Sequence, residues 1–464
     1  MRRTLRRFGV DRAVAFGVAS RVFSVLAGPV TLLIIAARLS RVEQGYYYTF
    51  ASLLAIQSFL ELGLGTVIVQ FASHEWSELS VDEQGRVNGS ARSSSRLASL
   101  LRFSIRWYVM ASIAAVLGLG LAGHFFFARS EAGGPAWVWP WLALCVTSGA
   151  ALALLPLWSI LEGCNRVGSV YLFRLWYSIV TTLAIWGALV SGAGLWTAPL
   201  AAATGVVFSA AVLLRLYRGF FRSLLSQRVE EGIDWRTEIL PLQWRIAVSW
   251  ISGYFVFQIF TPMSFRMLGP EVAAQVGMSW AVVTAVAATA YTWVATKIPR
   301  MGILVAQGAY TELDRLFFRA SALSLAAFVV ASAMGLAATA WLYASGHPLA
   351  SRILPVLPFA LFLAGSLIAT ATWNLSAYAR AHKQEPFVGI SVLGGAITAF
   401  AAFLLGRRFG VTGMAAGYFG AWCVQCALFA ARFVRLRAAW HHQSHELSSD
   451  VLGASGTLLE IGCE

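Results

Sequence analysis

Glu61 is a carboxylate inside a long apolar stretch, FLELGLGTVIVQF (residues 59–71). It is the only one of the 21 acidic residues that falls well inside a predicted membrane span. An ionised side chain at the bilayer centre costs about 2.5 to 3.5 kcal/mol on the insertion scale. Glu61 is therefore expected to be protonated, paired with a cation or exposed to a water-filled cavity. Gln57, Ser58 and Gly65 share its helical face, which predicts a polar stripe that points away from lipid.

Arg21 is the second ionisable side chain that the sequence places deep in the membrane. It lies about 12 Å from the inner end of the first predicted span, and Glu61 lies about 15 Å deep in the second. Because the two spans are antiparallel neighbours, the two side chains are at similar depth and can meet. Three roles stay open for Glu61: a structural ion pair with Arg21, a protonation site for ion coupling, or part of a cavity wall.

Four further polar side chains are candidates for contact with a substrate. Arg245 lies at the start of the seventh predicted span, and Tyr254 and Gln258 are polar residues near the middle of that span. Arg174 lies five residues into the fifth span, close enough to the surface to reach the headgroups. For the two arginines the alternative to ligand binding is anchoring to lipid phosphate. For Tyr254 and Gln258 it is hydrogen bonding between helices.

Membrane-spanning helices must position these side chains. The chain of 464 residues is 58% hydrophobic and 12% charged, with a mean hydropathy of +0.69, which lies outside the range of soluble domains. A stretch of about 20 apolar residues is long enough to cross a bilayer. Twelve such stretches occur, at 13–37, 46–71, 107–128, 137–161, 169–190, 194–214, 246–265, 276–296, 320–343, 353–378, 387–406 and 412–431. The sequence therefore predicts an all-α polytopic membrane protein.

The distribution of Lys and Arg predicts the orientation of the spans. Basic residues near span ends stay on the cytoplasmic side of a membrane. With both termini in the cytoplasm, the inner segments hold 27 of the 35 Lys and Arg residues and the outer segments hold 7. This asymmetry supports the twelve spans. It also explains the net charge of +14 without nucleic acid, because the basic groups face anionic lipid.

The inner segment 215–245 separates six spans from six, which predicts two lobes. The N-terminal lobe would cover 1–214, the cytoplasmic linker 215–245 and the C-terminal lobe 246–436. An even number of spans gives both lobes the same orientation in the membrane. The polar, Ser-rich segment 437–464 is predicted to be a disordered cytoplasmic tail.

Several kinds of chemistry find little support in the sequence. The outer loops are at most ten residues long, which leaves little room for an outward-facing enzyme site. The C-x-x-C pair of Cys423 and Cys426 lies in an apolar span, where packing of small residues is favoured over metal or redox chemistry. The His-rich segment 441–445 is interpreted as solvated tail. No G-x-x-x-x-G-K-[ST] motif occurs, so ATP is not the direct energy source, and no cofactor or metal is expected.

A family resemblance begins in residues 37–70, ARLSRVEQGYYYTFASLLAIQSFLELGLGTVIVQ. This segment resembles the early region of polysaccharide biosynthesis membrane proteins, the O-antigen-type repeat-unit flippases of the multidrug/oligosaccharidyl-lipid/polysaccharide (MOP) exporter superfamily. In that family the first helix ends in a Leu-Gly-x-x-x-(Phe/Gln)-Gly-x-Tyr turn, and the second helix carries an acidic or polar residue before Leu-Gly. The matching residues are Leu39, Gln44, Gly45 and Tyr47 in the turn and Glu61, Leu62 and Gly63 in the second element. Ser40 stands where the family usually has Gly.

The resemblance implies two six-helix lobes around a central cavity, as in MATE-like transporters of the MOP superfamily. It further implies a flippase in the bacterial cytoplasmic (inner) membrane that moves an undecaprenyl-pyrophosphate-linked oligosaccharide to the outer leaflet by alternating access. A polysaccharide polymerase and glycosyltransferases would be its partners. The expected contacts are Arg21, Arg174 and Arg245 to the pyrophosphate and Gln57, Tyr254 and Gln258 to the sugar, with Glu61 as the ion-coupling residue.

Other functions stay open at this point. A cation-coupled multidrug exporter of the same superfamily would need an acidic, aromatic cavity, and one intramembrane acid against several arginines argues against it. A membrane-embedded enzyme of glycan assembly is disfavoured by the short outer loops. A structural partner in a glycan-export complex is the remaining alternative.

Overall fold

The computed structural model describes residues 12–57, 61, 63–82, 85–128, 134–230, 232–235, 258–382 and 384–460, with side chains between 15 and 440. The chain forms two compact units, Met1–Met278 and Ser279–Glu464, and each is described by itself. Arg245, Tyr254 and most of the seventh predicted span lie outside the described residues.

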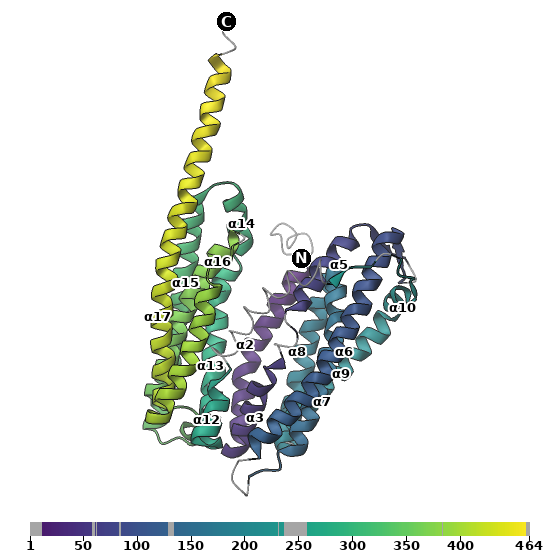
Figure 1. Cartoon of the computed structure of the whole chain (residues 1–464). Coiled ribbons are helices and arrows are strands. Elements are labelled where there is room, and N and C mark those ends of the chain that lie inside the picture. Colours follow the sequence, from purple (N-terminus) through teal and green to yellow (C-terminus); the bar gives the residue numbers. More distant parts are fainter. Residues whose placement is uncertain are drawn as a thin grey trace, which may run out of the picture. The chain divides into compact units, whose positions relative to one another are not determined.

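In its described residues, unit 1 contains helices and one short β-hairpin (Figure 1). Strands β1 (Leu79–Val81) and β2 (Val87–Gly89) pair antiparallel, and they connect α5 to α6. The helices are α2 (Arg12–Arg38), α3 (Arg41–Leu54), α5 (Leu64–Trp76), α6 (Ala91–Phe127), α7 (Val138–Gly163), α8 (Val167–Val190), the 3-10 helix η1 (Gly194–Trp196), α9 (Thr197–Leu216), α10 (Arg218–Ser226) and α12 (Phe260–Leu268).

In its described residues, unit 2 contains helices joined by short turns. Helix α13 (Pro270–Ala295) starts in unit 1 and continues into unit 2. The other elements are α14 (Ile298–Ala306), α15 (Tyr310–Ala344), the 3-10 helix η3 (Pro348–Arg352), α16 (Val356–Ala381) and α17 (Val388–Glu460). Helix α16 packs against both α15 and α17.

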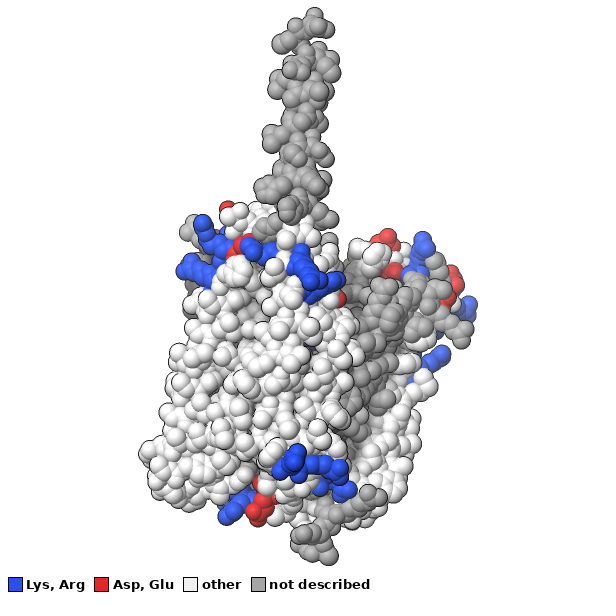
Figure 2. All heavy atoms as spheres, turned by 60° about the vertical axis from the view of Figure 1, so that its left-hand side comes forward, with Lys and Arg blue, Asp and Glu red and all other residues white. Residues whose placement is uncertain are grey.

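Nine helical stretches in the described part of the chain are long and apolar enough to cross a membrane. Most of their side chains are not buried inside the protein. In α2, for example, Val22, Val25 and Leu26 are all more than half exposed, as expected for a helix that contacts lipid. Figure 2 shows a wide uncharged band on one face, with Lys and Arg gathered at its two ends. The prediction of an all-α polytopic membrane protein is confirmed.

The second predicted span, 46–71, is not one continuous helix. Helix α3 ends at Leu54 and α5 begins at Leu64, and Gly63 between them has a left-handed backbone with φ of 68°. Glycine adopts this conformation at little cost because it has no Cβ. Gln57 and Glu61, four residues apart, are both helical, and the left-handed Gly63 separates them from Gly65 in α5. The polar side chains are therefore not carried by one continuous helix.

The last two predicted spans form a helical hairpin within α17. The backbone leaves helical geometry at Phe409 and Gly410, where Gly410 has φ of 59°. The two arms pack closely, because a Cβ on Gly417 would lie 2.8 Å from the backbone of Ala401. Further from the turn, the rings of Phe387 and Phe429 stack with centroids 4.5 Å apart. The turn separates two antiparallel helices, and it lies between the predicted spans 387–406 and 412–431.

Helix α7 lies at the centre of unit 1, in contact with α5, α6, α8 and α9. Its end approaches α5 closely at Gly163, where a Cβ would lie 2.6 Å from the Ala72 side chain and 2.7 Å from the Val69 carbonyl oxygen. A small residue there permits close contact between helix backbones, which is the usual way that helices pack in membranes.

The predicted lobe boundaries, 1–214 and 246–436 with a linker at 215–245, stay a prediction because residues 231 and 236–257 lie outside the described residues. Helix α17 continues to Glu460, so its backbone includes most of the segment 437–464 for which the polar composition predicted disorder.

Candidate functional site

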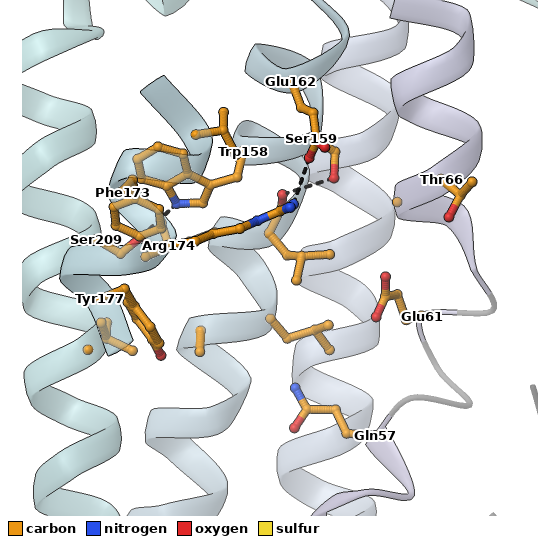
Figure 3. A pocket seen from close by; sticks show the side chains of 18 of the residues that line it. Gln57, Glu61, Thr66, Trp158, Ser159, Glu162, Phe173, Arg174, Tyr177 and Ser209 are labelled. Atoms are coloured by element: carbon orange, nitrogen blue, oxygen red, sulfur yellow. Dashed lines mark hydrogen bonds and ion pairs between the residues drawn. The ribbon is translucent and has the colours of Figure 1, made fainter. Parts of the chain in front are cut away.

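Unit 1 contains a cavity of about 1040 Å³. Its walls come from the interrupted second span and from α7, α8 and α9, and Figure 3 shows it from close by. The polar side chains that line it are Gln57, Glu61, Thr66, Ser159, Glu162, Arg174, Tyr177, Ser209 and Gln258. The remaining lining is apolar and aromatic.

One wall of the cavity carries Glu61 and Gln57 (Figure 3). The Gln57 amide nitrogen donates a hydrogen bond of 3.1 Å to the carbonyl oxygen of Ser148, which ties this wall to α7. The Glu61 Oε1 atom lies 3.0 Å from the position that a Cβ on Gly65 would take, and the Ser159 hydroxyl lies 3.4 Å from the same point. The carboxylate therefore folds over the first turn of α5, next to a hydroxyl of α7.

The opposite wall in Figure 3 is aromatic. Trp158 and Phe173 stack with their centroids 3.6 Å apart and their planes within 10°. Phe208 continues the stack on Phe173 at 5.8 Å and 7°. The Trp158 indole N–H donates a 2.8 Å hydrogen bond to the Ser209 hydroxyl, which fixes the indole plane. Tyr177 adds a further ring and a hydroxyl to the lining.

The ion pair of Arg174 and Glu162 joins α8 to α7 next to the aromatic stack (Figure 3). The Arg174 Nη2 donates to the Glu162 Oε2 atom at 2.6 Å, and its guanidinium also lies 5.1 Å from the centroid of the Tyr171 ring. The described lining thus holds two carboxylates, Glu61 and Glu162, and a single guanidinium that is already paired with one of them. The described lining therefore has one more carboxyl group than it has guanidinium groups.

The structure brings four of the predicted site residues together in this cavity. They are Gln57, Glu61, Arg174 and Gln258. Arg21 is exposed on α2 and is not part of the lining, and it has an interaction of its own within the chain. Its pairing with Glu61 stays a prediction. Arg245 and Tyr254 lie outside the described residues.

Sequence reasoning missed the aromatic stack and Glu162. Glu162 was assigned to an inner loop because the apolar span before it ends near residue 161. The signal was present in the spacing of α7, where Trp158 and Glu162 are four residues apart and therefore lie on one helical face. Arg174 was considered only as a partner of lipid or ligand phosphate, so its pairing with a nearby carboxylate was not foreseen.

Metal ligation finds no support among the described side chains, which contain no group of three His, Cys, Asp or Glu residues placed to hold an ion. Cys423 is exposed on α17 and Cys426 is partly buried. The side chains of the His-rich segment 441–445 lie outside the described residues.

Comparison with solved structures places this architecture among known transporters. An inward-facing multidrug resistance MATE family transporter of the MOP superfamily has a TM-score of 0.64 at 12% identity, covering 92% of this chain and 99% of the other. The lipid II flippase MurJ, in an inward closed conformation, has a TM-score of 0.66 at 11% identity, covering 93% and 90%. The MATE multidrug transporter DinF-BH in complex with R6G has a TM-score of 0.59 at 12% identity, covering 91% and 95%.

The chain has the fold of these transporters. No protein-family model and no curated protein matches its sequence. The structural neighbours include a flippase and multidrug transporters rather than enzymes, and at 11 to 12% identity the likeness concerns the fold alone.

Proposed function

We propose that this chain is a flippase that moves an undecaprenyl-pyrophosphate-linked oligosaccharide from the cytoplasmic to the outer leaflet of the bacterial inner membrane. The observation that carries this proposal is the cavity of unit 1, in which stacked aromatic rings lie opposite carboxyl and amide groups. Sugar rings present C–H faces that pack on aromatic rings, and their hydroxyls donate to carboxylates and amides. The cavity offers one wall of each kind.

The size of the cavity agrees with a substrate larger than a simple metabolite. Its volume of about 1040 Å³ lies at the upper end of the range for small-molecule sites. The likeness of the fold to the lipid II flippase MurJ makes translocation of a lipid-linked headgroup a natural use of such a cavity. In this proposal the sugars contact Gln57, Gln258 and the aromatic stack.

Binding of the diphosphate group to Arg174 is limited by an existing ion pair. This guanidinium is the only one in the described lining, and Glu162 already holds it at 2.6 Å. A diphosphate that bound Arg174 would have to displace Glu162 or share the guanidinium with it. Arg21 and Arg245 remain the other proposed cationic contacts, and Glu61 remains the proposed ion-coupling residue.

A second candidate is a cation-coupled exporter of amphipathic cations. The observation that favours it is the charge of the described lining, in which two carboxylates outnumber one paired guanidinium. An acidic, aromatic cavity attracts organic cations by charge and by cation–π contact. The sequence alone pointed the other way, because Glu162 was placed in a loop.

Deletion of the gene followed by extraction of membrane lipids tests the two candidates. Accumulation of complete undecaprenyl-linked repeat units on the inner leaflet is expected for the flippase, with loss of surface polysaccharide. Unchanged lipid-linked glycans together with increased sensitivity to lipophilic cations would favour the exporter. Accumulation of an incomplete glycan would indicate an enzyme of glycan assembly instead.

The site assignment is tested by Glu61→Gln in the full-length protein. Loss of glycan export is expected, at normal expression in the membrane. Glu312→Gln is the matched control, because Glu312 is an exposed acid in the first turn of α15 and lies outside the cavity. Intact export in the Glu61→Gln variant would show that this carboxylate is not part of the transport site.

A further inference from the structure

Helix α10 (Arg218–Ser226) is a short amphipathic helix that follows α9 directly. The membrane-spanning stretch that contains α9 ends at Leu216, and Tyr217 between the two helices has φ of −123°, outside the helical range. Phe220, Phe221 and Leu224 form its buried face. The position of α10 at the end of a span places it at the surface of the bilayer.

The buried face of α10 is fixed to unit 1 by specific contacts. The Ser223 hydroxyl accepts a hydrogen bond of 3.2 Å from the backbone N–H of Val87 in β2. The guanidinium of Arg102 on α6 donates to the carbonyl oxygen of Leu225 at 2.9 Å and also to that of Gln227. Because these contacts fix the rotation of the helix, they determine which side chains it presents outward.

The outward face is strongly basic. Arg218 and Arg222 are one helical turn apart on this face, and both are exposed. Residues 215–228 contain four arginines, and none of these 14 residues is acidic. The two outer ones, Arg215 and Arg228, are exposed as well. A guanidinium pairs with phosphate through two parallel hydrogen bonds, and Arg is preferred where such recognition matters.

Exposed leucines flank the basic residues. Leu214 and Leu216, at the end of the α9 span, are 65% and 71% exposed, and Leu225 on α10 is 44% exposed. In a membrane protein such side chains at a span end contact acyl chains. Guanidiniums beside exposed leucines match the two parts of a phospholipid, a phosphate headgroup and its hydrocarbon tails.

We propose that α10 is a binding site for an anionic phospholipid. The phosphate is held between Arg218 and Arg222, and the acyl chains lie against Leu216 and Leu225. The occupant is a bulk lipid of the membrane and not the transported substrate, since these side chains are not part of the unit 1 cavity.

Occupancy of this site also affects the segment that follows α10. After α10, the chain runs along α6, where Ser94 accepts from the Gln227 side chain at 2.9 Å and Ser95 accepts from the backbone N–H of Glu230 at 2.9 Å. Trp235 then stacks on Trp107 with centroids 5.8 Å apart. A lipid that holds α10 in place also stabilises this segment, so anionic lipid raises the thermal stability of the protein.

The test is lipid binding to the purified full-length protein, measured by native mass spectrometry in detergent. The probes are phosphatidylglycerol and phosphatidylcholine with the same acyl chains. We expect preferential retention of phosphatidylglycerol, and a loss of roughly tenfold or more in its affinity in the Arg218→Gln/Arg222→Gln variant. Arg407→Gln/Arg408→Gln is the matched control, because these neighbouring arginines are also exposed but lie in α17.

Several outcomes would overturn the proposal. Equal retention of both lipids, or an equal loss of phosphatidylglycerol in the α10 and α17 variants, would mean that no specific site exists. Tighter binding of a polyprenyl diphosphate than of phosphatidylglycerol at the same arginines would make α10 a substrate site instead. A second measurement needs no variant: phosphatidylglycerol binding to the wild-type protein must weaken as NaCl concentration rises, and binding that is insensitive to salt contradicts an arginine–phosphate contact.

Discussion

At the scale of single residues, the position of the Glu61 carboxylate depends on the absence of a side chain at Gly65. A methyl group there would lie 3.0 Å from Glu61 Oε1 and 3.4 Å from the Ser159 hydroxyl. Gly65→Ala is therefore expected to displace the carboxylate and reduce transport. The free energy of unfolding should change by less than about 1 kcal/mol, because Ala is the better helix former and the Glu61 side chain can move aside.

Gly168→Ala is the matched control for this substitution. Gly168 occupies the second position of α8, as Gly65 does in α5, and a Cβ there meets no atom within 4 Å. Transport by each variant in proteoliposomes, with thermal denaturation for stability, checks the prediction. If both variants transport equally well, the placement of Glu61 by Gly65 has no functional importance.

The ion pair between Arg174 and Glu162 separates the two candidate functions at the same scale. Glu162→Gln removes the carboxylate that competes with an anionic substrate, so a diphosphate-bearing lipid should bind roughly tenfold more tightly. Half of the Arg174 side chain is exposed, so the free energy of unfolding should fall by less than about 1 kcal/mol. Binding of a polyprenyl diphosphate and of a lipophilic cation to the purified variant provides the measurement. Weaker binding of the cation, with the diphosphate unaffected, would support the exporter.

At the scale of elements, Glu75 and Arg96 join the end of α5 to the start of α6. Their side chains are only 8% and 19% exposed, and the Arg96 Nε donates to Glu75 Oε1 at 2.8 Å. Arg96→Gln leaves a nearly buried carboxylate without this partner and should reduce the free energy of unfolding by about 2 to 3 kcal/mol. The double variant Glu75→Gln/Arg96→Gln should lose less, because it leaves no uncompensated charge. Chemical denaturation in detergent compares them, and equal losses would contradict the argument.

Glu78 makes the same junction sensitive to pH. The Ser93 hydroxyl donates a 2.7 Å hydrogen bond to Glu78 Oε2. Hydrogen bonds from Ser93 and Ser90 lower the pKa of this carboxyl below its ordinary value, with smaller contributions from Arg92 and His74. Because the folded-state pKa is lowered, the contact stabilises the junction above the ordinary carboxyl pKa, and the stabilisation is lost as pH falls through the lowered value.

Ser93→Ala should move the pKa of Glu78 back towards its ordinary value. NMR titration of the labelled glutamate carboxyl carbon gives this pKa directly. Ser77→Ala is the control, because the Ser77 hydroxyl donates to the His74 carbonyl oxygen and not to Glu78. An unchanged titration in the Ser93 variant would mean that the hydrogen bond does not stabilise the ionised carboxyl.

Hydropathy was enough to predict where the continuous membrane-spanning helices lie in the sequence. The spans at 137–161 and 353–378 correspond to α7 and α16 within a few residues. The interruption before α5 was not predicted, because Gly63 is flanked by leucines and the segment has the composition of a continuous span. Glu61 and Gln57 were recognised because a polar side chain in an apolar run is costly. Trp158 and Phe173 were not recognised as site residues, because an aromatic side chain in a membrane span has no comparable energetic cost.

At the scale of the whole molecule, the fold and the substrate depend on different parts of the sequence. The architecture is shared with transporters at 11 to 12% identity, so it is compatible with very different side chains. Apolar spans and their basic ends predict the number and orientation of the helices. The substrate depends on a few side chains in one cavity, and a single carboxylate such as Glu162 changes the charge of its described lining. The fold therefore follows from the sequence more directly than the substrate does.

The distribution of Lys and Arg along the sequence predicts how the chain is oriented in the membrane. Ser80 in the β-hairpin belongs to a predicted inner segment, and Ser345 after α15 belongs to a predicted outer one; both are exposed. In a variant without the five native cysteines, Ser80→Cys should react with a membrane-impermeant maleimide only when the cytoplasmic face is accessible. Ser345→Cys should react in intact spheroplasts. The two positions must be separated by an odd number of crossings, so labelling of both from the same side would show that one span between them is wrongly assigned.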